Sequence, residues 1–176
     1  MSGAASYCIA QYNSPVGRLT LAGDGAGLSG LWLEGQKYFG GSLAGELVPG
    51  GDLPVFAQVR DWLDRYFAGA RPDPRALPLA PVGGGFRKAV WKLLLDIPYG
   101  QTAAYGELAR RLAVQRGLAS MSAQAVGGAV GHNPISIVIP CHRVVGSSGS
   151  LTGYAGGVDK KRWLLAHEGV DVSGLR

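Results

Sequence analysis

The stretch Pro140-Cys141-His142-Arg143-Val144 is the part of the sequence around which the rest of the chain can be organised. The run before it is apolar and mostly β-branched, with Ile135, Ile137, Val138 and Ile139. That run predicts a buried strand or extended segment that Pro140 interrupts, with Cys141 at its end. A buried cysteine is ordinarily an inert apolar side chain. The adjacent histidine and arginine favour a reactive thiol instead, because a base and positive charge promote the thiolate.

Length and composition point to a globular chain. Its 176 residues, 47% of them hydrophobic, suffice for one domain with a good core or two small domains. No apolar run approaches the roughly 20 residues of a membrane span, and the start of the chain lacks the features of a signal peptide. We therefore expect a cytoplasmic protein without membrane contact.

Cysteine and histidine are scarce in this chain. The two cysteines, Cys8 and Cys141, do not form a CxxC pair, and there are three histidines. This content argues against a disulfide framework and against a zinc site of the usual four-ligand kind. We expect neither a metal nor a cofactor.

Positive charge is concentrated in the second half of the sequence. Residues 1–85 hold six Lys and Arg against seven Asp and Glu, giving −1, whereas residues 86–176 hold eleven against five, giving +6. A polyanion such as nucleic acid is a natural partner for the basic half that contains Cys141. A solvated basic surface without a partner is the alternative.

Residues 1–80 are predicted to form a first domain with a small antiparallel sheet. Alternating apolar residues and turn residues predict strands at residues 7–12, 19–22 and 28–33, and the glycine-rich stretch 40–52 is predicted to be a loop. Apolar residues at helical spacing after Pro54 predict a helix that stops at Gly69. Prolines and glycines in residues 71–85 place the boundary to a second domain, residues 81–176, in that segment.

The second domain is predicted to be mostly helical. Helices are expected at residues 86–97, from a cap at Thr102 to Leu112, at residues 122–131, and from a cap at Asp159 to a stop at Gly169. The residues from Val170 onward are expected to be less ordered. In the third helix, Gly127 and Gly128 each cost about 1 kcal/mol relative to alanine, so a closely approaching surface must favour them. That surface is either a packed helix or the groove of a duplex, as in a helix-turn-helix.

Three further residues are candidates for the chemistry of Cys141. His142 is adjacent to it, although neighbouring side chains of an extended segment point in opposite directions. Glu168 lies at a helix end where the macrodipole disfavours a carboxylate, so we expect it to have a partner such as His142; an exposed helix terminus is the alternative. Asn133 can tie the turn at Pro134 to the cysteine segment, a purely structural role that would also explain it.

Several motifs together resemble a known family. They are, in order, Ala125-Val126-Gly127-Gly128-Ala129, Asn133-Pro134, Ile139-Pro140-Cys141-His142-Arg143-Val144, Gly153-Tyr154-Ala155-Gly156-Gly157 and Trp163-Leu164-Leu165-Ala166-His167-Glu168-Gly169. This order is similar to that of the methylated-DNA–protein-cysteine methyltransferases, also called 6-O-methylguanine-DNA methyltransferases. The resemblance implies an α+β fold, in which a ribonuclease-H-like domain with a small antiparallel sheet precedes a mostly helical, helix-turn-helix DNA-binding domain.

The resemblance also implies a function, which is DNA repair by direct reversal of damage. An alkylated guanine, and in some cases thymine, of double-stranded DNA is flipped out of the duplex, and its alkyl group moves irreversibly to Cys141. Contact with DNA would be through the minor groove, and the protein would act as a monomer, with cooperative binding along DNA as an option.

The resemblance further implies roles for individual residues. Glu168, His142 and a water would deprotonate Cys141, Asn133 would order this network, and Tyr105 would donate a proton to the departing guanine. Residues implied to line the substrate pocket are Val144, Ser147, Ser148, Tyr154, Ala155, Gly156, Gly157 and Lys161. Residues expected to contact DNA are Gln124, Ala125, Gly127, Gly128, Ala129, Arg111, Arg116 and Arg143.

This chain departs from the family pattern at three points. Gln124 stands where the family usually has an arginine that fills the space left by the flipped base, which predicts weaker extrusion. The connection at residues 110–122 is also about five residues longer than in relatives, and the zinc ligands of some relatives are absent. Two other functions stay open: a lesion sensor that does not react, and a cysteine hydrolase, for which no oxyanion hole is evident.

Overall fold

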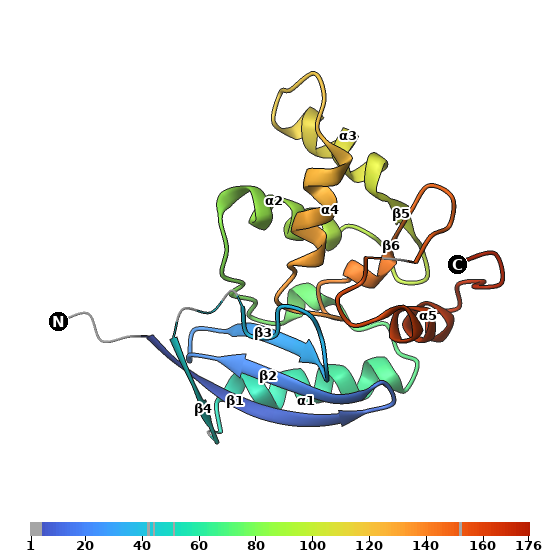
Figure 1. Ribbon diagram of the computed structural model, residues 1–176. Helices are drawn as coiled ribbons and strands as arrows, with labels where there is room; N and C mark the ends of the chain where they lie inside the picture. The colour runs from blue at the N-terminus through green and yellow to red at the C-terminus, as the bar shows by residue number, and fades with distance from the viewer. Residues whose placement is uncertain (1–4, 42, 44, 51, 152) are drawn as a thin grey trace. The chain divides into compact units, whose positions relative to one another are not determined.

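The computed structural model describes residues 5–41, 43, 45–50, 52–151 and 153–176 (Figure 1). Contacts divide the chain into two compact units, one of Met1–Val82 with Pro134–Ser136 and one of Gly83–Asn133 with Ile137–Arg176. The expectation about the start of the chain falls on residues 1–4, and part of the loop expected at residues 40–52 falls on residues 42, 44 and 51. Those residues lie outside the described part.

The first unit contains a four-stranded sheet with the order β3-β2-β1-β4. Its strands β1 (Ala5–Ser14), β2 (Gly17–Gly23) and β3 (Leu28–Leu33) pair antiparallel, as predicted, whereas β4 (Gly45–Pro49) runs parallel to β1. The prediction of a loop over residues 40–52 is therefore wrong for β4. Strand β4 pairs with residues of β1 that lie 40 positions earlier, and flanking glycines hide the short apolar signal of the strand.

One helix and two extended segments complete the first unit. Helix α1 (Pro54–Phe67) buries one apolar face against β1 and β2, and Gly69, at φ 95°, follows its end as predicted. A short 3₁₀ turn, η1 (Pro74–Ala76), follows. The outer edge of β3 is covered, because Leu28 pairs with Leu79 and Leu31 pairs with Ile135. An edge strand covered in this way offers few unpaired backbone groups to another chain.

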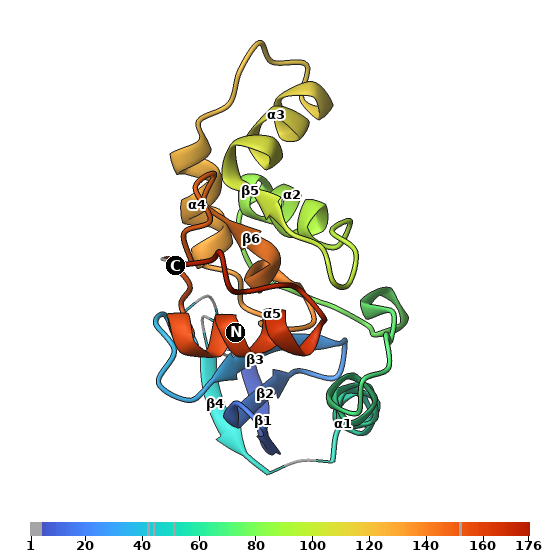
Figure 2. The same cartoon turned by 90° about the vertical axis from the view of Figure 1, so that its right-hand side faces the viewer.

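The second unit is mainly helical, as predicted, with α2 (Gly85–Leu94), α3 (Tyr105–Gln115), α4 (Ala123–Gly131) and α5 (Val158–His167). Helices α2, α3 and α4 contact one another (Figure 2). The Trp91 indole of α2 donates to the Ala129 carbonyl of α4 at 2.9 Å. The α+β fold and the helix-turn-helix, α3 followed by α4, are thus confirmed.

Two predicted helix caps are wrong. Helix α3 begins after Ala104 rather than at Thr102, because Ala103–Ala104 form a strand, β5, that pairs with β6 (Val144–Val145). Helix α5 begins after Gly157, whose φ is 99°, and Asp159 lies in its first turn instead of capping it. A carboxylate in the first turn still stabilises the helix through its dipole, so Asp159 marks the start of this helix, although it lies two residues after the cap.

The segment before Cys141 is buried but is not a strand. Ile135, Ile137, Val138 and Ile139 are each at most 1% exposed, yet beyond the single bridge at Ile135 they form turns, and Ile137 has φ 71°. Cys141–Arg143 form one turn of 3₁₀ helix, η2. β-branched residues indicated burial correctly, but among the described residues of this segment only Ile135 pairs with a strand, through its bridge to Leu31 of β3.

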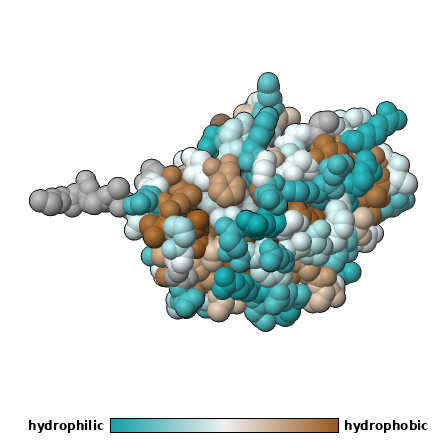
Figure 3. All heavy atoms as spheres, turned by 60° about the horizontal axis from the view of Figure 1, so that its bottom comes forward, coloured by the Kyte–Doolittle hydropathy of each residue, from teal (hydrophilic) through white to brown (hydrophobic). Residues whose placement is uncertain are grey.

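The residues after Val170 are also packed, contrary to expectation. Val170, Val172 and Leu175 lie against a buried cluster of Val145, Leu151 and Leu165. Exposed apolar side chains are scattered elsewhere, and the face shown in Figure 3 carries separate hydrophobic patches among hydrophilic residues. In the described part of the chain, no helix is long and apolar enough to cross a membrane.

Candidate active site

Cys141 lies in the second unit at the start of η2 and is 5% exposed. Asn133, which follows α4, donates from its amide nitrogen to the Ile139 carbonyl at 2.8 Å and so holds the segment that leads to the cysteine. Burial raises the pKa of the Cys141 thiol, while a hydrogen bond from Asn133 and the charge of Lys161 lower it. The thiol at rest is therefore protonated, and these two residues favour the thiolate when a base removes the proton.

His142 is fully buried and is set up as that base. Its Nε2 lies 2.6 Å from Glu168 Oε2. Because an ionised carboxylate only accepts, Nε2 must carry the proton, which leaves Nδ1 with its lone pair. In the described structure Nδ1 has no hydrogen-bond partner. Burial lowers the pKa of His142 more than Glu168 raises it, so the imidazole is neutral near pH 7 and can accept a proton.

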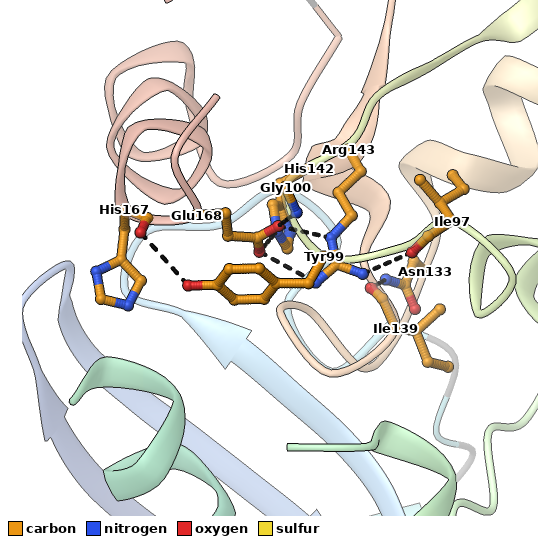
Figure 4. A network of polar contacts seen from close by, with 9 residues as sticks. All are labelled: Ile97, Tyr99, Gly100, Asn133, Ile139, His142, Arg143, His167 and Glu168. Carbon is orange, nitrogen blue, oxygen red and sulfur yellow. Dashed lines mark hydrogen bonds and ion pairs between the residues drawn. The ribbon is translucent and has the colours of Figure 1, made fainter. Parts of the chain in front are cut away.

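Glu168 lies at the centre of a polar network (Figure 4). Its carboxylate accepts from His142, from the Gly100 amide at 3.1 Å and from Arg143 Nε at 2.7 Å. Burial alone would raise the pKa of Glu168, but the hydrogen bonds and charges of His142 and Arg143 outweigh it and hold that pKa well below its usual range. Glu168, at the end of α5, thus has His142 as its partner, as its position at a helix end predicted.

Arg143 has a different position from the one expected of a DNA contact. It is 8% exposed, its Nη1 donates to the Ile97 carbonyl at 2.7 Å, and its guanidinium lies over the Tyr99 ring. This position does not support the predicted contact of Arg143 with DNA, because the ion pair with Glu168 keeps the guanidinium buried. The sequence analysis did not pair Arg143 with Glu168. Arg143 is adjacent to His142, the expected partner of Glu168, and this adjacency was the signal that could have indicated the pair.

Buried Lys161 and half-buried Tyr154 form a second pair close to Cys141. The Lys161 ammonium is fully buried over the Tyr154 ring, 5.7 Å from its centroid. Neither Lys161 Nζ nor the Tyr154 hydroxyl has a hydrogen-bond partner among the residues described. Burial lowers the pKa of Lys161 to about 8, and the negative charge of Cys141 opposes this shift. Burial, followed by the charges of Cys141 and Glu168, raises the pKa of Tyr154 well above its usual value.

A cavity of about 450 Å³ lies beside the helix-turn-helix. It is lined by Tyr105, Ala123, Gln124, Gly127 and Gly153, so it brings together the first residue of α3 and the start of α4. Burial and the charge of Cys141 raise the pKa of Tyr105, which keeps its phenol protonated. Gly153 and Ala123 were not among the predicted site residues.

The other predicted pocket residues differ in exposure. Val144 is buried in β6, Ser147 and Ser148 are exposed in the turn that follows, Ala155 and Gly156 are half-buried, and Gly157 is exposed before α5. All of them belong to the second unit. The described residues contain no group of three His, Cys, Asp or Glu side chains placed to bind a metal ion.

The residues predicted to contact DNA are mostly, but not all, on the surface. Gln124, Ala125 and Gly128 are exposed on α4 and Gly127 is half-buried, whereas Ala129 is 3% exposed and its carbonyl accepts from the Trp91 indole, which does not support the predicted contact of Ala129 with DNA. Two exposed arginines lie nearby in the sequence: Arg111 pairs with Glu107 at 2.6 Å, and Arg116 lies over the Phe86 ring.

A buried cysteine beside an imidazole–carboxylate pair, in a unit built on a helix-turn-helix, defines a protein with a nucleophilic cysteine and a DNA-binding type of fold. Two family models match the chain. The 6-O-methylguanine DNA methyltransferase ribonuclease-like domain matches residues 8–81, and the DNA binding domain of the same family matches residues 85–170.

Individual relatives agree. The methylated-DNA–protein-cysteine methyltransferases of Haemophilus influenzae and Mycobacterium tuberculosis are 42% and 45% identical, each over 89% of this chain and over 83% and 88% of their own lengths. The crystal structure of Mycobacterium tuberculosis OGT in complex with DNA matches with a TM-score of 0.76 and 41% identity, covering 97% of this chain and 94% of that one. The chain belongs to the 6-O-methylguanine DNA methyltransferase family.

Proposed function

We propose that this protein repairs double-stranded DNA by moving an alkyl group from the 6-oxygen of guanine to Cys141, once per molecule. The observation that carries the proposal is the pair His142–Glu168, with the unpartnered Nδ1 of His142 in the residue next to the buried thiol. Such a pair removes the thiol proton on demand without a metal. Cys141 is 5% exposed, and the charge of Lys161 favours its thiolate.

The proposed step conserves atoms and charge. The Cys141 proton passes to His142, directly or through a water, and the sulfur attacks the alkyl carbon. The carbon–oxygen bond breaks, guanine leaves with the electron pair, and the protonated phenol of Tyr105 supplies a proton to it. The proton taken up by His142 then returns through water to the Tyr105 phenolate, so that the products are an S-alkylcysteine, guanine and the two side chains in their starting protonation states. A thioether has no ready leaving route, so the protein is consumed in one turnover.

Alkylated guanine would reach the sulfur from the cavity beside the helix-turn-helix, whose volume suits a planar base. Its walls would include Gly153, Tyr154 and the backbone of Val144. The same pocket would use Lys161, Ser147, Ser148, Ala155, Gly156 and Gly157, with Asn133 ordering the cysteine segment. Of these residues Gly153 lines the described cavity, and all of them belong to the second unit.

DNA would bind through the exposed small residues of α4 in the minor groove, with the protein acting as a monomer. Gln124, at the start of α4 and on the cavity wall, would occupy the space vacated by the flipped base. Arg111 and Arg116 would contact phosphates. We also propose that the chain divides functionally near residues 80 and 81, with all the chemistry in the C-terminal part.

The test is the intact mass of the protein after incubation with a duplex that contains one O6-methylguanine. We expect the mass of one methyl group to be added in the wild type and in Cys8→Ser, and no addition in Cys141→Ser. Unmodified wild-type protein that still binds the methylated duplex would identify a lesion sensor instead. Burst turnover of an ester or amide would identify a hydrolase.

A further inference from the structure

Residues 170–176, here called the clasp, fold back onto the second unit in a way that the proposed reaction does not require. Their apolar side chains Val170, Val172 and Leu175 pack on Val145, Leu151 and Leu165. The Leu175 amide donates to the Val172 carbonyl at 3.1 Å and closes a turn. The clasp is therefore a defined element with a small core beneath it.

Arg162 holds this turn from helix α5. Its Nη1 donates to the Val172 carbonyl at 3.0 Å and its Nη2 to the Leu175 carbonyl at 3.1 Å, so one guanidinium bridges both ends of the turn. Arg162 follows Lys161, which is buried near Cys141. Successive residues of a helix point in directions about 100° apart. Helix α5 thus presents one cation to the active site and the next to the clasp.

The clasp is bonded to the loop that leads to the cavity. The Leu151 amide donates to the Arg176 carbonyl at 2.6 Å, and the Arg176 amide donates to the Gly149 carbonyl at 3.0 Å. Gly149 has φ +82°, and a Cβ there would lie 3.1 Å from the Gly174 carbonyl oxygen. The close approach of the clasp therefore depends on glycine at position 149.

Two residues beyond Leu151, the chain forms the wall of the cavity. Gly153 lines the cavity, and the next residue is Tyr154, whose buried hydroxyl has no partner in the described structure. Gly153 has φ +88° and no side chain to anchor it. Tyr154 is held from the side that follows it, because the Gly157 amide donates to its carbonyl at 3.1 Å, whereas Leu151, two positions before Gly153, is held by the clasp.

We infer that Arg162 is a positioning residue which, through the clasp and Leu151, fixes the cavity wall at Gly153 and Tyr154 and so limits the size of alkyl group that Cys141 accepts. This inference rests on the proposed function, because it concerns the same cavity. A firm wall holds a small methylated base at attack distance. A loosened wall loses that alignment but admits a bulky group, whose own contacts position it.

The test compares two free bases, O6-methylguanine and O6-benzylguanine, which reach the cavity without duplex binding. Rates of S-alkylation are followed by intact mass in the wild type, Arg162→Met, Arg162→Lys and the exposed control Arg65→Met. In Arg162→Met we expect the methyl rate to fall about tenfold and the benzyl rate less than about threefold, so the benzyl-to-methyl ratio rises at least about threefold. Arg162→Lys should lie between, and Arg65→Met should match the wild type.

A merely structural role would lower both rates equally, in proportion to the folded fraction, and an unchanged ratio overturns the inference. If Arg162→Met does not fold, Gly149→Ala displaces the clasp without removing its guanidinium bridge and should raise the same ratio. Hydrogen exchange of the Leu151 amide should speed up in either variant. A wild type that adds no alkyl group from either free base or from the methylated duplex contradicts the proposed function itself, whereas a reactive wild type with unaltered ratios in both variants contradicts only the role of Arg162.

Discussion

Around Glu168, charged and polar side chains are buried, and each is held by named partners: Glu168 accepts from His142, Arg143 and the Gly100 amide. On α4, by contrast, the exposed residues Gln124, Ala125 and Gly128 are small or neutral, and the space where a Gly128 side chain would lie contains no protein atom within 4 Å. Apart from His142 Nδ1, which has no hydrogen-bond partner in the described structure, the groups of the first region bond to one another. The second is understandable only with a surface that comes close to it.

The difference teaches where substitutions should act. Changes in the buried network leave a charge without its partner in a low dielectric, so they should affect both folding and chemistry. Changes on α4 should leave folding intact and alter the reaction only when the alkyl group is carried by a duplex. Comparing duplex and free-base substrates therefore separates the two regions.

Glu168→Gln should have the largest effect. It leaves the Arg143 guanidinium buried without a carboxylate and removes the group that fixes the His142 tautomer. We expect a loss of about 3 to 5 kcal/mol in unfolding free energy from urea titration. We also expect a fall of about a hundredfold or more in methyl transfer from both duplex and free base. The control Glu107→Gln, in an exposed pair on α3, should change stability by about 0.5 kcal/mol or less.

The Glu168 carboxylate also makes the free energy of unfolding depend on pH in the acid range. The folded state holds the pKa of Glu168 well below its usual range, so its contribution to stability is complete above the unfolded pKa of about 4.3 and is lost as pH falls toward the folded pKa. Urea titrations between pH 6 and pH 3 should show this acid loss in the wild type. A Glu168→Gln protein that loses just as much stability over that range would contradict the assignment.

Lys161→Met comes second, because it removes a buried ammonium that has no hydrogen-bond partner in the described structure. At pH 7 we expect equal or higher stability, since an uncompensated buried charge is costly. Methyl transfer should nevertheless slow about tenfold from both substrates, because the thiolate loses its nearby positive charge. Lower stability together with unchanged transfer would contradict this account.

The lowered pKa of Lys161 also predicts that the free energy of unfolding changes with pH in the alkaline range. Its folded pKa of about 8 lies below the unfolded value of about 10.4, so between these values the unfolded chain binds a proton that the folded chain does not. Stability contributed through this residue therefore rises over that range, by an amount of the order of 3 kcal/mol in the limit. In Lys161→Met this rise should be absent from urea titrations at pH 8 to pH 10.

Local sequence signals predicted the features whose causes are local. The spacing of apolar residues predicted α1, Gly69 marked its end, and the β-branched residues before Cys141 indicated burial. The cost of glycine inside a helix likewise marks Gly128 of α4 as a position that needs an explanation. Each of these follows from a few neighbouring residues, which is why the sequence alone could show them.

Features that depend on distant partners could not be predicted. Strand β4 exists because β1 pairs with it, and the clasp is held by Arg162 and by a loop more than 20 residues earlier. From its sequence, Arg143 is expected to be a cation on the surface. Its guanidinium is instead buried, because it donates to the Ile97 carbonyl, 46 positions away, and to Glu168. The direction of a charged side chain is decided by such contacts rather than by its neighbours in sequence.

Gln124→Arg tests the α4 side of the comparison. Gln124 lines the cavity at the start of α4, and an arginine there would add positive charge for the duplex. We expect methyl transfer from duplex DNA to rise about tenfold, equivalent to about 1.4 kcal/mol, and transfer from free O6-methylguanine to stay unchanged. Gln115→Arg, which adds the same charge at the exposed end of α3, controls for charge alone. An unaltered duplex rate in Gln124→Arg would show that glutamine does not weaken extrusion.

Gly128→Ala should have the smallest effect on folding and the most specific effect on binding. Its Cβ meets no protein atom within 4 Å, so the helix should gain about 0.5 to 1 kcal/mol of stability, measured by urea titration. If a duplex approaches the α4 backbone closely, the added methyl group should weaken duplex binding severalfold, measured by fluorescence anisotropy. Gly106→Ala in α3, whose Cβ has ordinary contacts, should not weaken it. A stabilised Gly128→Ala protein with unchanged duplex affinity would mean that the exposed glycine serves no close contact, and the minor-groove proposal for α4 would then fail.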